Sequence, residues 1–136
     1  MNLLGTFEIN FLLQTTITVV VLVSMAFRMK NNFLGHAITI TAAVISGWVV
    51  FAIASQLLSD ATYMQTLTNP TLNMATFVSH ASLGLASFVS GTALVALLLL
   101  DRAIPGRTNL LAKIVAVLWS LSLVVGALFY LILHVI

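Results

Sequence analysis

Four long apolar runs follow one another along the chain, separated by polar stretches. They cover Glu8–Phe27, Leu34–Leu58, Thr76–Leu100 and Leu110–Val135. Each run meets the length of roughly 20 residues that an α-helix needs to cross a hydrocarbon core about 30 Å thick. A helix satisfies its backbone hydrogen bonds within the segment, whereas an open strand in lipid does not. The pattern therefore predicts an all-α integral membrane protein with four transmembrane helices.

The connections predict how these helices are arranged. Short connections favour antiparallel neighbours, so residues 1–136 are expected to form one domain, an up-down four-helix bundle. Cytoplasmic loops of membrane proteins carry an excess of Lys and Arg. All the basic residues here lie in or beside the first and third connections, which predicts cytoplasmic connections there and an N-out/C-out topology. These residues are Arg28, Lys30, Arg102, Arg107 and Lys113.

The composition agrees with a membrane domain and argues against several classes of function. Of the 136 residues, 61% are hydrophobic and 6% are charged, whereas about 25% of the residues in soluble domains are charged. The net charge of +2 is too small to indicate nucleic-acid binding, and the lipid bilayer is the expected environment. The absence of Cys leaves no thiolate ligand for a metal or cluster. No hydrolase or phosphate-loop spacing is present, so we expect a protein that is not an enzyme.

His80, near the start of the third run, is the only ionisable residue of that run, and such residues at membrane depth are functional candidates. In helical steps it shares one face with Gly84, Ser87 and Gly91, whose small side chains form a groove. Either another helix or a flat ligand would fit that groove.

His134 provides a second imidazole at the same expected level. It lies near the outer end of the fourth run, with Tyr130 and Gly126 on its own helical face. Two facing imidazoles at one depth, with small residues beside them, are the arrangement that holds a b-type heme. The pair His80 and His134 therefore forms one hypothesis for a cofactor site.

A copper ion is the alternative cofactor for a site at the same level of the membrane. Met64 and Met74 are expected in the outer connection beside His80, and thioether together with imidazole suits Cu(I). The third interpretation is that His80 and His134 bind no cofactor and are hydrogen-bonded residues at helix or headgroup interfaces. The residues alone leave these three interpretations open.

His36 begins the second helix on the cytoplasmic side. The second helix reaches the level of His80 only near Ile53, roughly 25 Å further on at 1.5 Å per residue. His36 and His80 therefore cannot ligate one small centre. His36 is interpreted either as a residue of the helix start at the interface or as a contact to a partner, a cofactor propionate or a lipid headgroup.

The order of several motifs resembles a known family. They are His36 followed by Ala42, the stretch FVSHASLGLA over residues 77–86, and Trp119, Gly126 and Tyr130 in the spacing W-x6-G-x3-Y. Together they resemble the domain-of-unknown-function family 420, small four-helix membrane proteins that include the CtaM-type oxidase maturation proteins. The chain departs from the family where a further His usually precedes the fourth helix, because Thr108 stands there. The family's Pro shortly before the Trp is also missing.

The resemblance implies an accessory or maturation role around a respiratory heme–copper oxidase, in the plasma membrane of a prokaryote. The expected partners are then other membrane subunits of the oxidase. Two alternatives are kept: a di-His b-type cytochrome that itself passes electrons, and a structural small subunit of a larger membrane complex.

Overall fold

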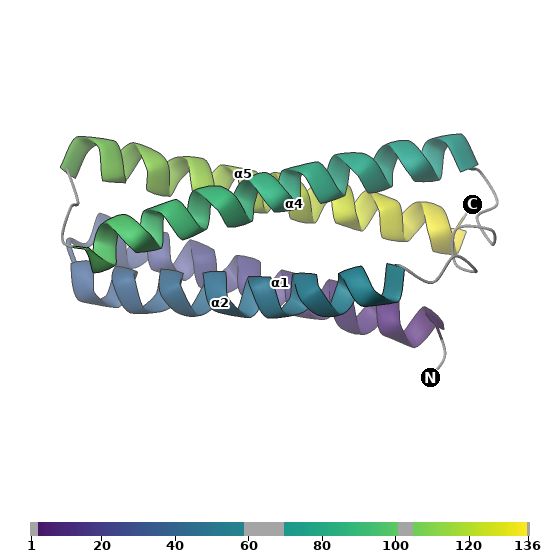
Figure 1. Ribbon diagram of the computed structural model, residues 1–136, viewed down its shortest axis with the longest axis horizontal. Coiled ribbons are helices and arrows are strands. Elements are labelled where there is room, and N and C mark those ends of the chain that lie inside the picture. Colours follow the sequence, from purple (N-terminus) through teal and green to yellow (C-terminus); the bar gives the residue numbers. More distant parts are fainter. Residues whose placement is uncertain (1–2, 59–69, 101–104, 136) are drawn as a thin grey trace.

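Four long helices make up the described part of the chain (Figure 1). The computed structural model describes the backbone of residues 3–58, 70–100 and 105–135, and the side chains of 8–55, 71–100 and 106–132. The helices are α1 (Leu3–Met29), α2 (Phe33–Leu58), α4 (Pro70–Leu99) and α5 (Pro105–Val135), and the described ranges contain no strand. The predicted all-α class and the four helices are confirmed.

The helices form two hairpins that pack side by side. α1 pairs with α2 and α4 pairs with α5, while α1 also contacts α5 and α2 also contacts α4. The helices thus form a ring in which α1 and α4, like α2 and α5, lie across the bundle from each other. Figure 1 shows α1 and α4 ending, and α2 and α5 beginning, at the left end, while α1 begins and α5 ends at the right end. This is the expected up-down bundle.

The connection between α1 and α2 is short because both helix ends are capped by asparagines. Asn31 has a φ of 57°, in the left-handed region that Asn tolerates better than most residues. Its N–H donates to Arg28 O at 3.1 Å, and Asn32 N–H donates to Phe27 O at 2.9 Å, which together are a Schellman ending. Asn32 Oδ1 then accepts from Gly35 N–H at 2.9 Å as the N-cap of α2.

The third and fourth helices begin earlier than the apolar pattern predicts. α4 begins at Pro70 rather than near Thr76, and α5 begins at Pro105 rather than near Leu110. Proline fits the first turn of a helix, where its missing N–H would have no partner. The polar residues that follow each proline belong to the first helical turns, although hydropathy alone predicts that they lie in the connections.

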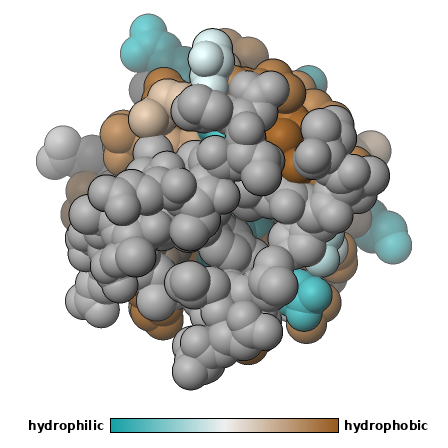
Figure 2. Space-filling model, turned by 90° about the vertical axis from the view of Figure 1, so that its right-hand side faces the viewer, coloured by the Kyte–Doolittle hydropathy of each residue, from teal (hydrophilic) through white to brown (hydrophobic). Residues whose placement is uncertain are grey.

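The outer surface of the bundle is apolar on every helix. All four helices are long and apolar enough to cross a membrane, and most residues of each span are not buried inside the bundle. Hydrophobic brown residues dominate the visible flanks in the end view of Figure 2. Large exposed side chains occur on each helix, for example Leu12, Ile45, Val89 and Val124. Such a surface matches lipid, so the chain is a multi-pass membrane protein with a transmembrane four-helix bundle.

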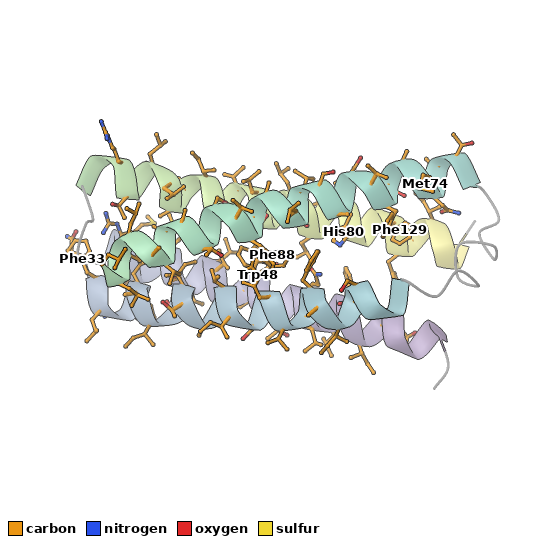
Figure 3. The ribbon with its side chains drawn as sticks, viewed as in Figure 1. Phe33, Trp48, Met74, His80, Phe88 and Phe129 are labelled. Carbon is orange, nitrogen blue, oxygen red and sulfur yellow. The ribbon has the colours of Figure 1, made fainter. Side chains whose placement is uncertain are left out.

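Aromatic rings fill the middle of the bundle. Phe88 lies 5.3 Å from the Trp119 ring in an edge-on arrangement and 5.4 Å from the Trp48 ring. Figure 3 shows Trp48 and Phe88 together between their helices. The indole N–H of Trp48 donates to Thr92 Oγ1 at 2.9 Å. Trp119 is therefore buried between helices, whereas Trp48 packs against α4 with 37% of its surface exposed.

Candidate functional site

His80 joins α4 to α5 by a hydrogen bond. Its Nδ1 lies 2.8 Å from the backbone oxygen of Ser122. Because that oxygen can only accept, Nδ1 carries the proton and donates it. Ser122 Oγ is 3.4 Å from the same Nδ1 and 3.5 Å from His80 O. His80 and Ser122 thus face each other across the helix pair, and we call this contact the outer clasp.

The outer clasp depends on a glycine one turn further along α5. A Cβ built on Gly126 would lie 2.9 Å from His80 Cε1 and 3.0 Å from its Nδ1. Since Gly126 is four residues after Ser122, its missing side chain lets the imidazole reach the Ser122 carbonyl beside the helical backbone. The sequence interpretation placed Gly126 on the helical face of His134, whereas in the structure the His80 imidazole packs against Gly126.

Helix α5 occupies the small-residue groove beside His80. A Cβ on Gly84 would meet Ser122 Oγ of α5 at 3.6 Å. A Cβ on Gly91 would meet Val44 Cγ2 of α2 at 2.9 Å and the Trp119 ring of α5 at 3.4 Å. Ser87 is buried, and its hydroxyl donates to Leu83 O of its own helix at 2.7 Å. The groove therefore packs against neighbouring helices in this bundle.

His36 makes a similar contact within the first hairpin. It is completely buried, and its Nδ1 lies 3.0 Å from the backbone oxygen of Ser24 and 2.8 Å from Ser24 Oγ. Ser24 Oγ in turn donates to His36 O at 3.1 Å. Both residues therefore donate to each other's backbone carbonyl, and we call this contact the inner clasp. His36 lies in the first turn of α2, in agreement with its interpretation as a residue of the helix start, and its side chain is buried there.

The two clasps use the same chemistry at opposite ends of the bundle. In each hairpin a histidine on one helix donates from Nδ1 to a serine carbonyl on the other. His36 lies near the end with the hairpin connections, whereas Figure 3 shows His80 toward the end with the termini. The two imidazoles are far apart, which agrees with the separation expected from helical rise.

The remaining residues of the predicted outer site do not complete a ligand set. Met74 was expected in the connection but lies in α4, six residues before His80, so it points to a different helical face and is 45% exposed. The position of Met64 and the side chain of His134 lie outside what the structure describes. Tyr130 is described, and its ring stacks on Phe11 of α1 at 5.4 Å.

The described residues contain no group of three or more His, Asp or Glu side chains that converge to hold a metal ion.

Ser24 was not singled out from the sequence, because a single serine in an apolar run gives no indication of the helix that it faces. Thr108 and Asn73 were likewise not expected to be buried, yet both are, and their side-chain polar atoms have no hydrogen-bond partner in the described part of the structure.

Comparison with known proteins adds no relative to this description, because no family model, curated protein or solved structure matches the chain.

Proposed function

We propose that this chain is a non-catalytic accessory protein of the membrane, which acts by packing against other membrane subunits. The observation that carries the proposal is the pair of clasps. The two described histidines use Nδ1 to hold neighbouring helices together. Interhelical hydrogen bonds of this kind are a usual means of fixing helix packing in lipid. The histidines thus have a role in architecture that needs no reaction.

A respiratory heme–copper oxidase is the partner that we propose, and the support for it is the resemblance of the motifs. In this bundle the shared residues contribute to helix contacts: Phe77 lies 6.1 Å from the Phe129 ring, Trp119 packs on Phe88, and Tyr130 stacks on Phe11. Gly126 seats His80. The resemblance therefore concerns residues that build the bundle. It favours an assembly or small-subunit role over electron transfer.

The test of this proposal is co-purification from native membranes. The tagged chain is extracted in a mild detergent and compared with an untagged strain by quantitative mass spectrometry. We expect oxidase subunits to be enriched several-fold, and the reduced-minus-oxidised oxidase signal of membranes to fall when the gene is deleted. Enrichment of a different complex, with unchanged oxidase signal, would replace the oxidase as partner and leave the accessory role in place.

Heme or copper at the outer level remains a separate hypothesis. The described residues do not fit a heme between α4 and α5, because the His80 ring fills the space over Gly126 and α5 fills the groove. Met74 does not point with His80 toward a common copper ion. Reduced and oxidised absorption spectra with metal analysis of the purified protein test the cofactor directly. A Soret band that is lost in His80→Ala would favour the b-type cytochrome instead.

A further inference from the structure

One layer of the bundle, at the end with the hairpin connections, contains a single fully buried residue from each helix. Ser24, His36 and Leu94 are 0% exposed, and Thr108 is 1% exposed. His36 and Thr108 are the fourth residues of α2 and α5, and Ser24 and Leu94 lie equally far from the last residues of α1 and α4. We call these four residues the inner layer.

Two polar atoms in the inner layer have no partner. Ser24 Oγ and His36 Nδ1 satisfy each other in the inner clasp, but His36 Nε2 and Thr108 Oγ1 are buried without a hydrogen bond in the described structure. The other buried threonine, Thr18, donates to Gln14 O of its own helix at 2.8 Å. Burying an unpaired polar group is unfavourable, and such groups in proteins commonly bind an ordered water.

The inner clasp determines what His36 Nε2 can accept. Because Nδ1 carries the proton that it donates to the Ser24 carbonyl, Nε2 of the neutral ring is a bare acceptor. The Thr108 hydroxyl has one proton to donate and two lone pairs. An occupant between them has to donate to Nε2 and also hydrogen-bond a hydroxyl, and water does both.

The arrangement of the helices puts these two residues at the same end of the bundle. α2 and α5 begin at the same end of the bundle and lie across the ring from each other. His36 and Thr108 are both buried at this level, and Leu94 and Ser24 are the fully buried residues at the same level of the other two helices. In hairpin α4–α5, Leu94 takes the place that Ser24 has in hairpin α1–α2, so Thr108 has no serine partner across its own hairpin.

We propose that the inner layer binds one water molecule, which donates to His36 Nε2 and hydrogen-bonds Thr108 Oγ1. The water links α2 to α5 and so joins the two hairpins through the bundle axis. Among the described residues, side-chain hydrogen bonds join α1 to α2, α2 to α4, and α4 to α5. The proposal does not depend on the accessory function, because it concerns the interior of the folded chain alone.

The test is nitrogen NMR of the full-length protein with 15N-labelled histidine in nanodiscs. Hydrogen bonding to an unprotonated imidazole nitrogen moves its resonance upfield. We expect His36 to be protonated at Nδ1. We also expect the Nε2 resonance at a shift typical of a hydrogen-bonded nitrogen, with a cross-peak between Nε2 and a water molecule held inside the bundle. Thr108→Val keeps the shape and removes the hydroxyl, so it should move the Nε2 resonance downfield and weaken the water cross-peak.

Thr18→Val is the matched control, because Thr18 is equally buried but its hydroxyl is satisfied within α1. It should leave the His36 resonances unchanged. A proton on Nε2, or an Nε2 shift typical of an unbonded nitrogen that Thr108→Val does not alter, would overturn the proposal. A hydrogen-bonded Nε2 without a water cross-peak would also overturn it and would assign a direct bond from the Thr108 hydroxyl.

Discussion

At the scale of single residues, His80 acts through one nitrogen and one neighbouring carbonyl. His80→Ala removes the donor to Ser122 O and leaves a space over Gly126. Interhelical hydrogen bonds in membrane proteins contribute about 0.6 kcal/mol on average and reach about 1.7 kcal/mol. We expect a loss of about 1–2 kcal/mol in the free energy of unfolding, including lost packing. Reversible unfolding in mixed micelles measures it.

Two variants separate the hydrogen bond from packing at the outer clasp. His80→Asn keeps an N–H donor near the position of Nδ1 and should recover part of the loss. Ser122→Ala removes only the hydroxyl at 3.4 Å and keeps the carbonyl that accepts at 2.8 Å, so we expect a change below about 0.5 kcal/mol. If Ser122→Ala were as costly as His80→Ala, the hydroxyl rather than the carbonyl would be the partner that matters.

At the scale of helix pairs, the outer clasp couples a histidine on α4 to a glycine on α5. Gly126→Ala puts a methyl group 2.9 Å from His80 Cε1, so the imidazole has to leave the Ser122 carbonyl. In a His80→Ala background the same change meets no imidazole, and alanine favours the helix by up to about 1 kcal/mol. A double-mutant cycle should therefore give a coupling energy of about 1 kcal/mol or more. Additive effects would contradict the clasp.

A second pair of glycines compares a close interhelical approach with an open position. A Cβ on Gly47 of α2 would lie 2.5 Å from Phe88 Cε1 and 3.0 Å from Trp119 Cζ2, whereas a Cβ on Gly106 meets nothing within 4 Å. We expect Gly47→Ala to destabilise the bundle by about 1–3 kcal/mol through overpacking. Gly106→Ala should be neutral or slightly stabilising. Thermal denaturation of both variants in one detergent makes the comparison, and equal melting temperatures would argue against this packing of α2 on α4.

The helices were predictable from the sequence, whereas the contacts between them were not. The lengths of the apolar runs alone identify four spans, because a helix that crosses lipid must be long and apolar. Hydropathy does not detect the first helical turns after Pro70 and Pro105, and for that reason the prediction placed Met74 in a connection. The face that holds His80, Gly84 and Ser87 follows from helical spacing. That α5 fills this face depends on the rotation of α5, which no local pattern encodes. The burial of His36 depends in the same way on the position of Ser24 in the neighbouring helix.

At the scale of the whole molecule, the bundle has two different ends. The hairpin connections and the nearby Arg28, Lys30, Arg107 and Lys113 lie at one end, and both termini lie at the other. The excess of basic residues predicts that the connection end is cytoplasmic. Because the chain has no cysteine, single cysteines report the topology without a background. Lys30 and Thr71 are exposed, described positions at opposite ends.

We expect Thr71→Cys to react with a membrane-impermeant maleimide in intact cells and Lys30→Cys to react only after the membrane is permeabilised. Val89→Cys, on the outer face of α4 within the span, is the control that should remain unlabelled in both states, because thiols in lipid are protonated and shielded from the reagent. The opposite labelling order would invert the topology. It would then place the inner layer on the outer side of the membrane and the outer clasp on the cytoplasmic side. A partner that recognises the His80 end would in that case have to approach from the cytoplasm, so this labelling decides from which side of the membrane the proposed partner can bind.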